Sequence, residues 1–188
     1  PRPPVPAVHR EGERPVIDRL IDLAANRYFR LFMVGLVVLS FQTTILNDMR
    51  PFGVCLQVML LLAASSGLAR GSEVGATAGF MIGLMYDMVL TTPLGVCAAV
   101  FAAVGYLAGY AHRFVHEPNW WSRMVLAAGA SAAGTILMPF ALTVVGVEGV
   151  LTLRVIGVAF VVAAFNAVFS LPFERVCRWA LSEPRVVR

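Results

Sequence analysis

Six apolar stretches, separated by short polar breaks, dominate the pattern of hydrophobic and polar positions along the chain. They cover residues 29–46, 52–68, 74–90, 94–113, 123–145 and 150–171. A helix rises about 1.5 Å per residue, so stretches of this length approach or match the roughly 30 Å hydrocarbon core of a bilayer. The pattern therefore predicts an all-α, polytopic membrane protein with six transmembrane helices.

The segments outside these stretches are too short and too polar to build a second core. Residues 1–28 begin Pro-rich and charge-mixed, which predicts disorder, and become amphipathic after Pro15, which predicts a short helix on the membrane surface. Residues 173–188 follow Pro172, which is expected to end or kink the last helix, and predict an amphipathic tail. We therefore expect one transmembrane domain over residues 29–172 between these two segments.

Composition supports the membrane assignment, and the charges predict its orientation. Of the 188 residues, 59% are apolar and 14% are charged. All fifteen basic residues are arginines, and six spans place thirteen of them on the side of both termini, against Arg50 and Arg154 on the other side. Because positively charged loops stay in the cytoplasm, both termini are expected there. The arginines flank apolar spans and form no single basic face, so no nucleic-acid partner is expected.

A ridge of small residues runs along the third apolar stretch. Gly75, Gly79 and Gly83 recur every four residues, so on a helix they share one slowly slanting face. Such spacing lets helices pack closely in lipid. Gly105 and Gly109 of the fourth stretch belong to the same candidate interface. The sequence leaves open whether this interface packs two helices of one chain or binds a partner.

Asp87 continues the spacing of the ridge and lies near the outer end of the predicted third helix. An ionisable residue at membrane depth is costly and is normally paired, and Arg50 and Arg154 are the two outer-side cations. Two interpretations stay open. Asp87 either takes part in proton or ion coupling, or it fastens the outer turn by bonding a threonine of that turn or one of the two arginines.

A short turn separates the third and fourth stretches. Thr92 precedes Pro93, which predicts an N-cap followed by proline at the first helical position, and Gly95 follows directly after Leu94. Because the link is so short, the two helices are expected to be antiparallel neighbours.

Candidate chemistry is otherwise sparse. The cysteines and histidines lack the spacing of metal ligands; they are Cys55, Cys97, Cys177, His9, His112 and His116. The chain shows no Ser/His/Asp set, no paired carboxylates and no phosphate-cradling loop. We therefore expect no catalytic residues, no cofactor and no metal. Asn166, in the second half of the last stretch, is expected to be a structural polar residue.

Several motifs together resemble the rod shape-determining protein MreD family of bacteria. The family has a Gly-Phe-x-x-Gly-x-x-x-Asp stretch, a short loop with a Leu-Gly pair, and a small-residue helix that ends near Gly-Tyr-Leu. The corresponding residues here are Gly79-Phe80-Met81-Ile82-Gly83-Leu84-Met85-Tyr86-Asp87, Pro93-Leu94-Gly95 and Gly105-Tyr106-Leu107. Arg50-Pro51 resembles the opening of the family's second span, and the stretch from Asn166 to Pro172 is similar to its last span.

This resemblance implies a non-enzymatic, multi-pass scaffold in the bacterial cytoplasmic (inner) membrane that supports cell shape. It implies binding to the bitopic membrane protein MreC. It further implies coupling to MreB filaments, and to RodA with a penicillin-binding protein, which together build side-wall peptidoglycan.

A different class of protein also has six spans and a similar size, namely the substrate-binding membrane subunit of an energy-coupling-factor vitamin transporter. Such a subunit should present several polar or aromatic residues to an outer pocket, and only Asp87, Arg50, Arg154, Tyr86 and Asn166 could contribute here. A proton-coupled carrier would show repeats with broken helices, and the two halves of the chain show no repeat.

Overall fold

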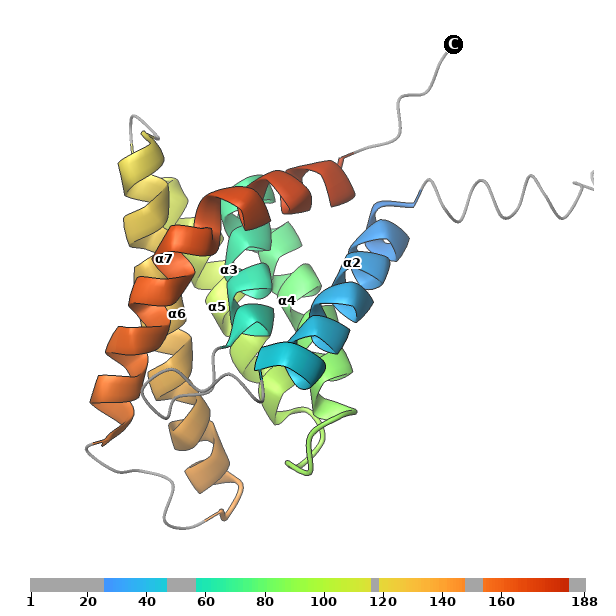
Figure 1. The fold of residues 1–188 in the computed structure, drawn as a ribbon, viewed down its shortest axis with the longest axis vertical. Helices are drawn as coiled ribbons and strands as arrows, with labels where there is room; N and C mark the ends of the chain where they lie inside the picture. The colour runs from blue at the N-terminus through green and yellow to red at the C-terminus, as the bar shows by residue number, and fades with distance from the viewer. Residues whose placement is uncertain (1–25, 47–56, 116–118, 148–153, 183–188) are drawn as a thin grey trace, which may run out of the picture.

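The computed structural model describes residues 26–46, 57–115, 119–147 and 154–182, which form helices and no strands (Figure 1). The elements are α2 (Arg27–Phe41), continued by the π-helical turn η1 (Gln42–Leu46), α3 (Val58–Arg70), α4 (Ser72–Asp87), α5 (Val96–His112), α6 (Trp120–Val144) and α7 (Arg154–Ala180). The all-α prediction is confirmed for these residues. Residues 1–25 and 183–188 of the two predicted flanking segments lie outside the described residues, as do Arg50 and Pro51.

Helix α3 lies at the centre of the bundle. Every residue from Val58 to Leu68 is buried, and the helix contacts α2, α4, α5, α6 and α7. Its small residues, among them Ala63, Ala64 and Gly67, let neighbouring helices pack closely around it. Its 13 residues rise about 20 Å. Residues 52–56, which belong to the predicted second stretch, lie outside the described residues.

Helices α4 and α5 form a tight antiparallel hairpin. Residues early in α4 face residues late in α5, as Gly75 faces Gly105, and residues late in α4 face residues early in α5, as Gly83 faces Cys97. The prediction that these two helices are antiparallel neighbours is therefore confirmed.

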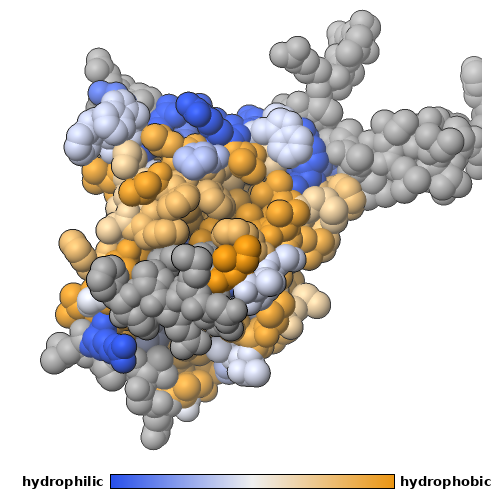
Figure 2. Space-filling model, in the orientation of Figure 1, coloured by the Kyte–Doolittle hydropathy of each residue, from blue (hydrophilic) through white to orange (hydrophobic). Residues whose placement is uncertain are grey.

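The longer helices surround this centre. By length and composition, α2 with most of η1, α6 and α7 are long and apolar enough to cross a membrane, whereas α3 and α5 are shorter apolar helices. Large apolar side chains point outward from the long helices, among them Val37, Val125 and Phe160. Figure 2 shows the resulting broad hydrophobic middle of the molecule. Such a surface suits lipid.

Helix α7 continues through Pro172 to Ala180 and bends in its second half (Figure 1). Proline lacks a backbone N–H and its ring crowds the preceding turn, so it kinks a helix where neighbouring packing supports the rest. Residues 173–180, predicted as the start of the amphipathic tail, thus extend the same helix.

Arginine side chains gather at the end of the bundle where α2 begins and α7 ends. A guanidinium N–H of Arg30 donates to the Ser182 hydroxyl at 3.1 Å, and one of Arg70 donates to the carbonyl oxygen of Arg178 at 3.2 Å. Figure 2 shows hydrophilic residues along this upper edge. Arg154 begins α7 at the opposite end. We call the first of these the arginine-rich end.

Candidate helix-packing site and apolar groove

The glycines of α4 lie directly against the backbone of α5. A Cβ atom on Gly79 would come within 2.2 Å of the carbonyl oxygen of Phe101, and one on Gly83 within 2.5 Å of the carbonyl oxygen of Cys97. Cβ atoms essentially never approach another heavy atom closer than 3.0 Å. Only glycine therefore permits this separation between the two backbones.

The same close approach extends to α3. A Cβ atom on Gly75 would lie 2.5 Å from the carbonyl oxygen of Gly105, and one on Gly105 would lie 2.2 Å from that of Gly75. A Cβ on Gly67 would lie 2.0 Å from the carbonyl oxygen of Gly105. At Gly109 the Cβ would meet the backbone of Gly71 at 2.4 Å. Gly67 was not among the interface residues predicted from the sequence, although it follows a run of small residues in α3 that could have indicated it. We call this set of contacts the glycine seam.

The glycine seam is covered by the chain itself. Gly75, Gly79 and Gly83 are buried in α4, and Gly105 and Gly109 are buried in α5. A partner helix cannot reach a face that is already in backbone contact with a neighbour. The geometry therefore supports the helix-packing interpretation of these five glycines, and a partner needs a different surface.

Asp87 follows the seam and caps the next helix. Its side chain is 2% exposed. The backbone N–H groups of Gly95 and Ala98 donate to Oδ2 at 2.9 and 3.0 Å, and that of Cys97 donates to Oδ1 at 3.0 Å. The first amides of a helix have no partner within the helix and carry the positive end of its dipole, so a carboxylate there satisfies both.

Of the two arginines predicted to pair with Asp87, the structure describes only Arg154. Within the described ranges, Arg154 forms no ion pair with Asp87, and Arg50 lies outside them. Asp87 does not need an arginine, because three backbone N–H groups at the start of α5 already donate to its carboxylate.

The turn before α5 differs from the predicted one. Helix α5 begins at Val96 with Gly95 as its N-cap, and Pro93 is not its first helical residue. Gly95 has a φ of 100°, in the left-handed region that glycine adopts without strain. Gly95, and not Thr92, therefore occupies the N-cap position of α5. The prediction of Thr92 as N-cap is wrong because Asp87 supplies the cap from the preceding helix.

Gln42 provides a second cap of the same kind, which was not predicted from the sequence. Its Oε1 accepts from the backbone N–H of Met59, in the first turn of α3, at 2.8 Å, and its Nε2 donates to the Tyr86 hydroxyl at 2.9 Å. The Tyr86 ring stacks on Phe101 with 5.8 Å between centroids. Gln42 is the first residue of the π-helical turn. The available signal was a lone glutamine in an apolar stretch.

Asn166 connects α7 to α6 and α3, away from Asp87. Its Nδ2 donates to the Ser131 hydroxyl at 2.9 Å and to the carbonyl oxygen of Gln57 at 3.4 Å, and its side chain is fully buried. Of the predicted polar residues that the structure describes, Asp87 and Asn166 thus do not share one site. Asn166 and Asp87 instead fasten different pairs of helices.

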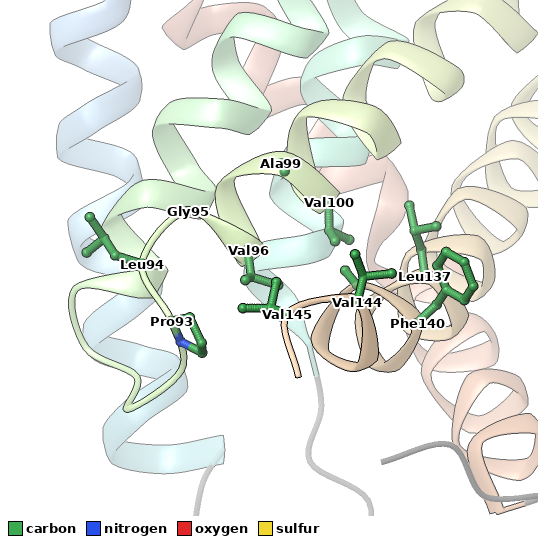
Figure 3. A pocket seen from close by; sticks show the side chains of 11 residues that line it. Pro93, Leu94, Gly95, Val96, Ala99, Val100, Leu137, Phe140, Val144 and Val145 are labelled. Carbon is green, nitrogen blue, oxygen red and sulfur yellow. The ribbon is translucent and has the colours of Figure 1, made fainter. Parts of the chain in front are cut away.

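An open apolar groove of about 530 Å³ lies beside the Asp87 cap. Figure 3 shows its walls, with the turn and α5 on one side and the end of α6 on the other. The lining residues are Pro93, Leu94, Gly95, Val96, Ala99, Val100, Leu137, Phe140, Ala141, Val144 and Val145. We call this the α5–α6 groove. Because Gly95 and Val96 belong to the segment that Asp87 holds, the carboxylate also shapes one wall of the groove.

The α5–α6 groove can recognise an occupant only by its shape, because it is lined by apolar residues. Its side chains are aliphatic or aromatic, so it offers van der Waals contact and no side-chain hydrogen bond or charge. Among the residues that the structure describes, no group of three His, Cys, Asp or Glu side chains could hold a metal ion. The arrangement suits an apolar helix better than a polar small molecule.

The fold and these contacts define an all-helical membrane protein whose buried polar groups hold helices together. The family model of the rod shape-determining protein MreD matches residues 26–178, and the chain belongs to this family. The match includes all the described helices except the last residues of α7. No curated protein and no solved structure matches the chain.

Membership of the family confirms the resemblance read from the sequence and gives the chain a role in rod-shape determination. The family is a shape-determining one and is not a known family of enzymes. Neither the comparisons nor the described residues favour the vitamin-transporter alternative.

Proposed function

We propose that this chain is a multi-pass scaffold of the bacterial elongation complex and that it binds the transmembrane helix of an MreC-like bitopic partner in the α5–α6 groove. The observation that carries the proposal is an open apolar groove next to a fully packed glycine seam. Through that partner the chain supports MreB, RodA and a penicillin-binding protein in side-wall peptidoglycan synthesis.

The lining of the groove favours a helix as the occupant. In lipid there is no hydrophobic driving force between helices, so association depends on close packing at small residues. Gly95, Ala99 and Ala141 supply such residues, and the large side chains of Phe140 and Val144 stand exposed beside them. A partner helix would cover these side chains and replace lipid with a fitted surface.

The proposed orientation has six spans with both termini in the cytoplasm, in the inner membrane. The gathering of arginines at one end of the described bundle supports it, because positively charged ends remain cytoplasmic. The α5–α6 groove lies toward the opposite end and would therefore open at the depth of the periplasmic leaflet. A bitopic partner with its main domain outside the cytoplasm would pass that depth.

The test is to fill the groove without touching the seam. Ala99→Trp adds a large side chain at an exposed position of the groove, whereas Ala133→Trp adds the same side chain at an exposed position of α6 that does not line it. Recovery of MreC with the chain in mild detergent should fall about tenfold for the first variant, which corresponds to ~1.4 kcal/mol.

The Ala133→Trp variant should recover MreC as the original chain does, and both variants should insert at equal abundance. Equal recovery with the two variants would show that the groove is not the binding surface, even if MreC remains bound elsewhere.

A further inference from the structure

A second pocket, of different chemistry, lies at the arginine-rich end. It has a volume of about 390 Å³ and lies between the start of α6 and the bent part of α7. Its lining residues are Trp120, Arg123, Leu171, Glu174, Arg175 and Arg178. Three guanidinium groups and one carboxylate give it a net positive charge. The rod-complex role uses none of these residues.

The carboxylate of Glu174 holds two of the arginines in place. Its Oε1 accepts from Arg123 at 3.1 Å and from Arg178 at 2.6 Å, and the Glu174 side chain is 3% exposed. One oxygen atom thus organises two guanidinium groups from two helices. Each guanidinium carries five N–H donors, so most of these donors remain for another acceptor.

Two further observations show unused donor capacity in the pocket. The Nε of Arg123 is buried and has no hydrogen-bond partner. Arg175 is exposed and forms no ion pair among the described residues. One buried glutamate therefore compensates only part of the positive charge, and the remainder faces the opening of the pocket.

We propose that this pocket binds the phosphate group of an anionic phospholipid. Guanidinium groups match phosphate oxygens in charge and in planar, bidentate geometry. Basic pockets between membrane helices recognise anionic lipid headgroups. We call it the headgroup pocket.

The surroundings of the headgroup pocket favour a lipid over a free phosphate ion. Trp120 lines the pocket and is 53% exposed, and the adjacent Trp121 is 61% exposed. Tryptophan is enriched at the level of the headgroups. An exposed apolar side chain, Val168, continues from the pocket along α7, one turn before the lining residue Leu171. A phosphate in the pocket would leave its acyl chains against this apolar surface.

The experiment compares lipids bound to the purified full chain in detergent by native mass spectrometry. Phosphatidylglycerol should be retained in preference to phosphatidylcholine. Arg175→Gln removes one exposed guanidinium without unpairing Glu174, and it should weaken phosphatidylglycerol retention about fivefold, as expected for one arginine near an anionic group. Arg113→Gln, at the same end but outside the pocket, is the matched control and should leave retention unchanged.

Three results would overturn the proposal. Equal retention of phosphatidylglycerol by the Arg175→Gln and Arg113→Gln variants would place the lipid elsewhere. Binding of inorganic phosphate to the pocket without preference for phosphatidylglycerol would identify a free anion as the ligand. Loss of a protein partner in the Arg175→Gln variant, with lipid binding absent throughout, would make the surface a protein contact.

Discussion

At the scale of single residues, two buried side chains satisfy the backbone amides of helices other than their own. Asp87 of α4 accepts three N–H groups at the start of α5, and Gln42 at the end of α2 accepts one at the start of α3. Leaving a buried amide unpaired costs about 1–3 kcal/mol. Asp87 is therefore the residue on which the start of α5 depends most.

Replacing the carboxylate should destabilise the fold. Asp87→Asn turns one of the two acceptor oxygens into an NH₂ donor that faces N–H groups, and it removes the negative charge at the dipole of α5. The midpoint of thermal unfolding of the purified chain in detergent should fall, with a loss of about 2 kcal/mol. Glu73→Gln removes an exposed carboxylate from the first turn of α4, so it controls for the dipole effect alone and should cost at most about 1 kcal/mol.

Charge reversal tests whether Asp87 caps α5 or pairs with Arg154. Asp87→Arg combined with Arg154→Asp should be no more stable than Asp87→Arg alone, since the carboxylate bonds amides. Recovery of stability in the double variant would contradict the cap.

At the scale of elements, the glycine seam brings the backbones of α4 and α5 into contact, and α3 meets them at Gly67. The cost of glycine in a helix is about 1 kcal/mol relative to alanine. The seam offsets that cost because the two backbones and their neighbours gain contacts that any larger residue would prevent.

Two glycine-to-alanine substitutions should differ in their effect on the free energy of unfolding. Gly79→Ala places a methyl group 2.2 Å from the Phe101 carbonyl oxygen and should destabilise the chain by about 1–3 kcal/mol, because the helices must separate. Gly129→Ala, in α6 with no atom within 4 Å of the added Cβ, should be neutral or stabilising. Denaturant unfolding of both variants measures the difference, and equal effects would exclude a tight seam.

The elements also show which features a sequence can predict. Long apolar runs separated by charges placed six helices in order, and the short turn predicted the antiparallel hairpin. The start of α5 was missed because capping rules inspect neighbouring residues, whereas Asp87 acts from eight residues before Gly95. Gln42 was missed for the same reason, since its partner Met59 becomes close only in the folded bundle.

At the scale of the whole molecule, charge and apolar surface are arranged along one axis. Arginines from helix ends that are distant in sequence meet at the arginine-rich end, and the Asp87 cap and the α5–α6 groove lie toward the other. The spacing of arginines in the sequence predicted this polarity, because it depends only on the alternation of helix directions. Only the folded contacts show that the glycines pack within the chain and that the open groove lies between α5 and α6.

Cysteine labelling tests the proposed orientation. Leu94→Cys and Phe114→Cys, at side chains 73% and 66% exposed near opposite ends of α5, are introduced into a chain without its native cysteines. In intact cells, a membrane-impermeant maleimide that has entered the periplasm should label the first and spare the second. Both should be labelled after permeabilisation. Labelling of Phe114→Cys in intact cells would reverse the orientation.

The backbone contact between α4 and α5 has a mechanical consequence. Side chains between helices normally let them slide by changing rotamers, but hydrogen atoms on glycine offer no such adjustment. The α4–α5 hairpin should therefore tilt as one rigid unit. Binding at the arginine-rich end that tilts the hairpin would move the wall of the groove with it. Relative movement of helices would occur at α2 instead, because its Gly35 contacts only the flexible end of the Met85 side chain.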